Sequence, residues 1–152
     1  MSVDASPSVT RIALESCFEF VCYAAPAGTD GLPLEPGQIQ CAADGRATLL
    51  HFAPRRWLVP SPSAALHTRL ADLEHRGRGA LIDVDGKWQM LRIADAAGIL
   101  GRSINVQALL RHRQCAAGVV FDCPVILARG ASVDLWVVSS YLDSLLAAVV
   151  GE

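Results

Sequence analysis

Two stretches of this chain repeat the same order of local signals, and that order limits the folds open to it. Residues 47–73 and 124–150 each hold an apolar strand-like run, a tight link, a second run with a tryptophan, and an amphipathic helix. In the first stretch Leu66, Leu70 and Leu73 share one helix face, as the helical period requires. We therefore predict an α+β fold with antiparallel or mixed sheets, helices packed on one face, and two strand–strand–helix pseudo-repeats.

The segment between these stretches predicts a hairpin. Residues 80–84 form an almost continuous apolar run, which is typical of a strand buried on both faces. Asp85 and Gly86 are typical of a two-residue hairpin turn, because such turns need positive φ at their central positions. The run 88–93 would then be the returning strand.

Capping residues predict where the helices of the second half begin and end. Asp95 can cap a short helix that Gly101 would close in the left-handed conformation. Ser103 or Asn105 can cap the next helix, and Ser140 with Asp143 would form a capping box for the last one. These residues therefore predict three helices, each beginning after a strand or loop.

The length of 152 residues fits one domain with a sizeable core. We predict a disordered lead-in over 1–8 and a single α+β domain over 9–152, divisible into lobes at about 9–78 and 79–150. Residues 24–37 contain three prolines and three glycines, so they predict a long surface loop.

The composition points to a protein that contacts other protein chains. Hydrophobic residues make up 52% of the chain and charged residues 18%, and the mean hydropathy is +0.35. Such an apolar excess favours oligomerisation or subunit assembly, although an alanine- and valine-rich core also accounts for it. A net charge of −2 argues against nucleic acid or an anionic membrane as partner.

Neither targeting nor metal chemistry is indicated. The apolar runs are interrupted too often to span a bilayer, and the N-terminus has no basic and apolar signal pattern, so we expect a cytoplasmic protein. The five cysteines lack the paired spacing of zinc ligands, and the four histidines are scattered. We predict no metal site, with the cysteines as buried or free thiols.

A few residues could carry chemistry, and each also has a plain structural interpretation. Arg111 and Arg113 could receive an acidic partner or an anionic ligand such as the glutamate tail of a folate, or could be a solvated loop. Arg55 precedes Trp57, so stacking of a cation on an aromatic face is conceivable there. Asp122 lies between apolar residues, where a carboxylate is either a turn residue or a buried acid; turn composition favours the first.

The order of these motifs resembles the gamma subunit family of heterotetrameric sarcosine oxidase. That family carries glycine-proline-x-x-tryptophan-leucine, a helix, and then alanine-leucine-x-aspartate-valine-serine; residues 53–58 and 80–85 stand in those places. A Cys-Ala pair at Cys115 and an apolar strand at 124–128 follow in the same order. The resemblance covers about 45–150, with Ala53 in place of the glycine and Asp85 in place of the serine.

The resemblance implies a fold and a role. The family is similar to the folate-binding aminomethyltransferase, the glycine cleavage T-protein. Its gamma chain is a small accessory subunit, while flavin, NAD and zinc belong to the other chains. The catalytic acid of the T-protein could be carried over only to Asp122, and Asp83 matches the family's aspartate at the end of a strand, where it either braces the turn or faces a cleft.

Three hypotheses follow. The first is a non-catalytic accessory subunit that packs against a larger flavin-dependent subunit and holds no cofactor itself. The second is a stand-alone folate-binding or one-carbon-transfer module that uses Asp122 with Arg111 or Arg113. The third is a homodimeric structural protein without other partners.

Overall fold

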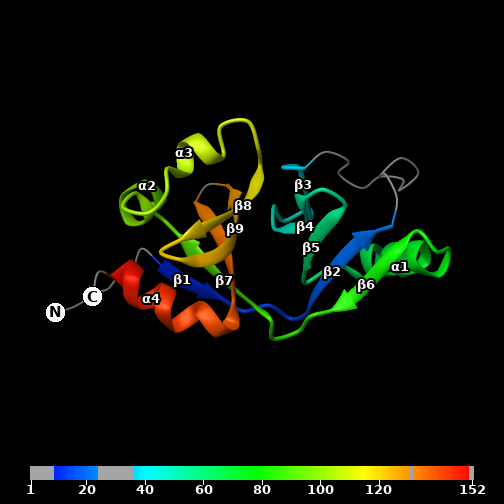
Figure 1. Cartoon of the computed structure of the whole chain (residues 1–152). Helices are drawn as coiled ribbons and strands as arrows, with labels where there is room; N and C mark the ends of the chain where they lie inside the picture. Colours follow the sequence, from blue (N-terminus) through cyan, green and yellow to red (C-terminus); the bar gives the residue numbers. More distant parts are fainter. Residues whose placement is uncertain (1–8, 24–35, 131, 151–152) are drawn as a thin grey trace.

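The chain folds into two five-stranded sheets, and every strand pair in them is antiparallel. The computed structural model describes residues 9–23, 36–130 and 132–150, so the predicted lead-in over 1–8 and most of the predicted loop over 24–37 lie outside the described residues. The first sheet has the order β1-β7-β10-β9-β8 and the second the order β3-β4-β5-β2-β6 (Figure 1). The strands are β1 (Val9–Ile12), β2 (Cys17–Cys22), β3 (Ile39–Cys41), β4 (Ala47–Ala53), β5 (Arg56–Pro60), β6 (Gly79–Asp83), β7 (Trp88–Ile93), β8 (Cys115–Val120), β9 (Cys123–Arg129) and β10 (Val133–Val138).

Helices cover the outer face of each sheet, as an α+β fold requires. The second sheet carries α1 (Ala64–His75), and the first carries α2 (Ala96–Leu100), α3 (Val106–Leu109) and α4 (Leu142–Val150). The inner faces of the two sheets pack against each other, which gives four layers in the order helix, sheet, sheet, helices. The predicted fold class is confirmed.

Strand alternation assigns each core side chain to one of these layers. On β9, Val125 and Leu127 contact the helices of the first sheet, while Ile126 and Ala128 join the core between the sheets. This alternation follows from the two-residue period of a strand. The core between the sheets is built from both of them by Cys17, Leu50, Leu58, Trp88, Met90, Cys115, Ile126, Ala128 and Trp136.

The two halves of the chain have the same topology and exchange one strand. The order β1-β2-β3-β4-β5-α1 corresponds to β6-β7-β8-β9-β10-α4, with α2 and α3 added between β7 and β8. However, β1 lies at the edge of the first sheet beside β7, and β6 lies at the edge of the second sheet beside β2. Each sheet therefore contains a strand from the other half, and both strand–strand–helix pseudo-repeats are present.

The predicted hairpin at Asp85 is wrong. A turn is present, because the Lys87 N–H donates to the Val84 carbonyl at 2.9 Å and Gly86 has φ of 81°. Yet β6 pairs with β2 and β7 pairs with β1 and β10, so the turn carries the chain from one sheet to the other. β6 lies at the edge of its sheet. It is also not buried on both faces, because Ile82 is 45% exposed.

The helix termini follow the capping residues in most cases. Asp95 accepts a hydrogen bond from the Gly98 N–H and Asn105 accepts one from the Ala108 N–H, as predicted. Gly101 is not left-handed, with φ of −62°; a side chain there would instead meet the Ala97 carbonyl. A short 3-10 turn at Ser139–Tyr141 precedes α4 and has no side-chain cap, so the capping box predicted at Ser140 is not formed.

Candidate functional site

A buried carboxylate joins the two sheets where their inner faces meet. Glu19 lies on β2 and is 5% exposed. Its Oε2 accepts hydrogen bonds from Lys87 Nζ at 2.7 Å and from Trp88 Nε1 at 2.9 Å, and its Oε1 accepts one from Arg56 Nη2 at 3.2 Å. Because Glu19 and Arg56 belong to the second sheet and Trp88 to the first, this carboxylate fastens one sheet to the other.

The surroundings of Glu19 favour its ionised form. Burial raises the pKa of the Glu19 carboxyl, but the hydrogen bonds from Lys87, Trp88 and Arg56 and the charge of Lys87 hold that pKa below its ordinary value of 4.5. A carboxylate held ionised by three donors is a structural anchor rather than a proton carrier at neutral pH. Sequence reasoning missed Glu19, because two of its partners, Lys87 and Trp88, lie 68 and 69 residues away along the chain.

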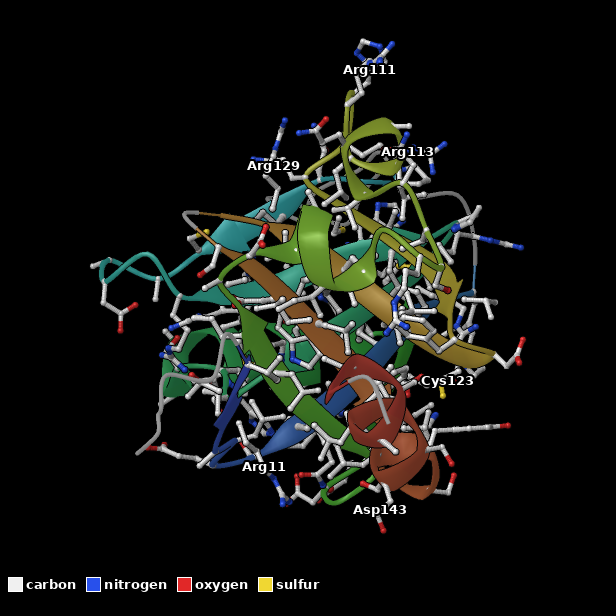
Figure 2. All side chains as sticks on the ribbon, turned by 90° about the vertical axis from the view of Figure 1, so that its left-hand side faces the viewer. Arg11, Arg111, Arg113, Cys123, Arg129 and Asp143 are labelled. Carbon is white, nitrogen blue, oxygen red and sulfur yellow. The ribbon has the colours of Figure 1, made fainter. Side chains whose placement is uncertain are left out.

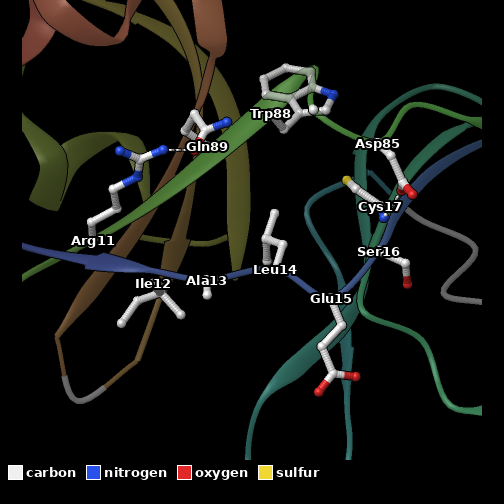
Figure 3. A pocket seen from close by; sticks show the side chains of 11 residues that line it. Arg11, Ile12, Ala13, Leu14, Glu15, Ser16, Cys17, Asp85, Trp88 and Gln89 are labelled. Atoms are coloured by element: carbon white, nitrogen blue, oxygen red, sulfur yellow. Dashed lines mark hydrogen bonds between the residues drawn. The ribbon is translucent and has the colours of Figure 1, made fainter.

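The segment 13–16, which links β1 to β2, lines two clefts. The first cleft, of about 540 Å³, is lined by this segment, by the β6–β7 turn and by parts of β1 and β7; Arg11, Leu14, Asp85, Trp88 and Gln89 are among its lining residues (Figure 3). The guanidinium of Arg11 donates to Gln89 Oε1 at 2.7 Å. The Asp85 carboxylate accepts from the Cys17 N–H at 2.7 Å. These two hydrogen bonds thus tie β1 to β7 and the start of β2 to the β6–β7 turn.

The second cleft, of about 690 Å³, combines an apolar floor with paired charges. Leu14, Pro60 and Met90 contribute apolar surface. Among its charged lining residues, Arg92 makes two hydrogen bonds to Asp134, at 2.8 and 3.2 Å, and Arg46 Nε lies 3.7 Å from Asp44. The volume is in the range of small-molecule sites, and each of these arginines has an acidic partner.

The predicted stacking site at Arg55 and Trp57 is occupied by the protein itself. Trp57 is fully buried, stacks on His51 with ring centroids 4.2 Å apart, and packs beside Phe20 at 5.9 Å. Arg55 adopts φ of 60° in the tight link and donates to the Tyr23 carbonyl at 3.3 Å. Neither face of the Trp57 indole is therefore open to a ligand in this conformation.

The two predicted aspartates lie in turns. Asp83 is exposed at the end of β6, and its carboxylate accepts a hydrogen bond from the Asp85 N–H at 3.0 Å, so it braces the turn. Asp122 is exposed in the two-residue link between β8 and β9, where Phe121 and Asp122 have φ of 47° and 64°. Positive φ at both positions is the signature of a primed hairpin turn.

The structure does not bring the predicted acid and the predicted arginines together. Arg111 and Arg113 precede β8, and Asp122 follows it. The six residues of β8 separate them by roughly 20 Å, at about 3.3 Å per residue. Figure 2 shows Arg111 and Arg113 at one end of the molecule and Cys123, the neighbour of Asp122, away from them.

The cysteines are held as inert thiols where they are buried. Burial and the nearby carboxylates of Glu19 and Asp85 raise the pKa of Cys17 to about 12, and burial raises that of Cys115 to about 12. Within 9–23, 36–130 and 132–150, no three His, Cys, Asp or Glu side chains gather as metal ligands would. No helix in that part of the chain has the length and apolar character needed to cross a membrane.

Comparison with known proteins finds a likeness among solved structures. No family model matches the chain, and no curated protein matches it. A chain in the structure of heterotetrameric sarcosine oxidase from Corynebacterium sp. U-96, in complex with pyrrole 2-carboxylate, is similar in fold, with a TM-score of 0.73 and 19% identity. The match covers 93% of this chain and 80% of that chain, so this protein shares its fold with a chain of that assembly over nearly its whole length.

Proposed function

We propose that this protein is a non-catalytic accessory subunit of a cytoplasmic complex like sarcosine oxidase, with the role of the gamma chain. The observation that carries this proposal is the fold likeness, which spans 93% of this chain and 80% of the matched chain. A similarity that covers most of both chains means that the whole fold is shared and not a single motif. The flavin-dependent chemistry would then belong to a larger partner subunit.

The arrangement of side chains supports an accessory role. The acid that family resemblance singles out, Asp122, is exposed in a turn, and the length of β8 separates it from Arg111 and Arg113. The buried carboxylate of Glu19 fastens the two sheets together. A buried charge used in this way stabilises the fold, which fits a subunit that supplies surface rather than chemistry.

Co-expression with the larger chains tests this proposal. The alpha and beta chains of a sarcosine oxidase from the same genome would be produced with and without this protein. We expect the larger chains to co-purify with it, and their soluble yield and sarcosine-dependent oxygen consumption to fall when it is omitted. Larger chains that assemble and work equally well without it would contradict the proposal.

A small-molecule-binding module is the second candidate function, and the second cleft favours it. That cleft lies at the junction of the two sheets and has a volume of about 690 Å³, with Arg46 and Arg92 among its lining residues. We propose folate as the ligand class to test first, because resemblance to the aminomethyltransferase family suggests it. Calorimetric titration with tetrahydrofolate up to millimolar concentration tests this second function. Folate binding that is lost in Arg92→Ala would support a site in this cleft. The absence of any binding would reject the binding-module function.

A matched pair of variants separates this cleft from the site predicted from sequence. Asp122→Asn and Arg113→Ala lie outside the second cleft, so they should leave folate binding there unchanged. If folate binding is lost in Arg113→Ala, the binding site lies instead near Arg113, just before the first residue of β8.

A further inference from the structure

One edge of the first sheet is partly closed by the chain and partly open. β8 pairs with β9 on one side only, and no strand of the described chain pairs with its other side. The carbonyl of Gln114 accepts the Arg129 N–H at 2.8 Å, so even-numbered residues of β8 direct their backbone groups to β9. The odd-numbered residues therefore direct their N–H and C=O groups outward.

The two ends of this edge are capped. The Cys115 N–H donates to the Gly37 carbonyl at 3.0 Å, and the Phe121 N–H donates to Ser103 Oγ at 2.7 Å. Between them the outward N–H groups of Ala117 and Val119 make no hydrogen bond within the described part of the chain. Both residues are exposed, Val119 to 58%.

An open strand edge is the surface on which an extended segment of another chain adds a strand. A charged side chain is one of the features that protect natural strand edges; on β6 the Glu74 carboxylate accepts the Leu81 N–H at 2.9 Å. The stretch Ala117–Val119 has only small apolar side chains and carries no such guard. The N–H and C=O groups of an extended segment could pair with the outward backbone groups of this stretch.

The charge near this edge indicates the chemistry of the partner. Arg111, Arg113 and Arg129 lie at the same end of the β8–β9 hairpin, on one side of the molecule (Figure 2). Among the described residues, none of the three forms an ion pair. The Arg113 side chain lies over Gly37, whose carbonyl caps the open stretch. Acidic side chains on an incoming segment would find these three guanidinium groups unneutralised.

We propose that the edge of β8 at Ala117–Val119 docks an extended segment of a larger partner subunit, with acidic side chains of that segment facing Arg111, Arg113 and Arg129. This inference rests on the accessory-subunit function proposed above and names the surface that such a subunit would use. Its physical basis is the outward backbone groups and small exposed side chains of Ala117–Val119, together with arginines at one end of the same hairpin that form no ion pair among the described residues.

Residue-resolved hydrogen exchange on the free chain and on the complex with co-expressed alpha and beta chains tests the proposal. In the free chain the amides of Ala117 and Val119 should exchange fast, while those of Ala116 and Gly118, bonded to β9, should be slow. In the complex, exchange at Ala117 and Val119 should slow by at least about tenfold, with Gly118 unchanged. A complex in which both amides stay fast overturns this inference but leaves the accessory-subunit function standing.

Substitutions at the edge give a second readout. Val119→Pro removes one outward N–H and should weaken assembly by at least about tenfold, whereas Val119→Thr keeps that N–H and should assemble normally. Arg113→Glu should weaken assembly as well, because it repels an acidic segment. If Val119→Pro does not fold, the exchange experiment and the Arg113→Glu variant still test the proposed docking edge.

Two further outcomes overturn the proposal. If no complex forms with the larger chains, the accessory-subunit function fails and the docking edge fails with it. If protection of Ala117 and Val119 instead rises with the concentration of this chain alone, the occupant of the edge is a second copy of the chain.

Discussion

The two halves of this chain, 9–75 and 79–150, follow the same strand order but use corresponding strands differently. In the first half β5 directs Trp57 toward α1, in the core of the second sheet with Phe20 and Leu70. In the second half β10 directs Trp136 toward the other sheet, beside Leu58 and Ile126. Since neighbouring residues of a strand face opposite sides, an offset of one residue moves a side chain from one core to another. Similar order along the chain therefore does not imply similar contacts.

The largest expected effect tests this difference between the two tryptophans. Trp57→Ala and Trp136→Ala should each lower the free energy of unfolding by about 3–5 kcal/mol, because both remove a large buried side chain. Hydrogen exchange should show faster opening of α1 in Trp57→Ala, and of strands in both sheets in Trp136→Ala. Loosening confined to the first sheet in Trp136→Ala would show that this residue does not join the sheets.

A milder substitution at the same positions sharpens the comparison. Among the described residues, the buried Trp136 Nε1 has no hydrogen-bond partner, whereas no such unsatisfied donor is found on the fully buried Trp57. Phenylalanine at 136 therefore removes an unsatisfied donor along with some volume, and Trp136→Phe should cost about 1 kcal/mol less than Trp57→Phe. Urea unfolding of the two variants measures this; equal costs would contradict it.

The link between the halves is the next test, with a surface ion pair as control. Glu19→Ala should lower the free energy of unfolding by about 2–3 kcal/mol, since it leaves the buried Trp88 N–H unpaired and frees two half-exposed cations. Asp134→Ala, which breaks the exposed pair with Arg92, should cost less than about 1 kcal/mol. Similar losses in both variants would mean that Glu19 does not hold the sheets together.

The same carboxylate predicts a dependence on pH. The pKa of Glu19 in the folded chain lies below its ordinary value of 4.5. Its contribution is therefore fully present at pH values above that ordinary value and is lost as the pH falls through the lowered pKa. The difference in stability between the wild type and Glu19→Gln should be constant near neutral pH and shrink in acid, as measured by unfolding at a series of pH values. A difference that grows in acid would reverse the assignment.

The smallest expected effect compares the starts of the two long helices. Ser63 Oγ accepts the Leu66 N–H at 3.1 Å at the start of α1, whereas no side chain caps the 3-10 turn before α4. Ser63→Ala should therefore cost about 1 kcal/mol, and Ser140→Ala less than about 0.5 kcal/mol. Thermal unfolding of both variants measures the contrast, and equal costs would restore the predicted capping box.

Local signals in the sequence predicted local structure well. The caps at Asp95 and Asn105 and the apolar face of α1 depend on neighbouring residues alone, so they could be read from spacing. The fold class and both pseudo-repeats were predicted for the same reason. There were two local exceptions. Gly101 keeps a right-handed conformation, and the Ser140 capping box does not form because the chain reaches α4 through a 3-10 turn.

Long-range pairing was beyond the reach of the same signals. The turn at Asp85 looks like a hairpin turn, but whether β6 pairs with β7 or with β2 depends on strands that are distant in sequence. Glu19 could not be found because its partners Lys87 and Trp88 lie 68 and 69 residues away. The open edge of β8 likewise depends on where Gly37 and Ser103 end their contacts with it.

The mass of the assembly formed on co-expression tests the central claim most directly. Native mass spectrometry of this chain produced together with the alpha and beta chains of a sarcosine oxidase from the same genome should show a complex that contains all of them. An assembly of the larger chains without this protein, beside a monodisperse monomer or homodimer of it, would contradict the account.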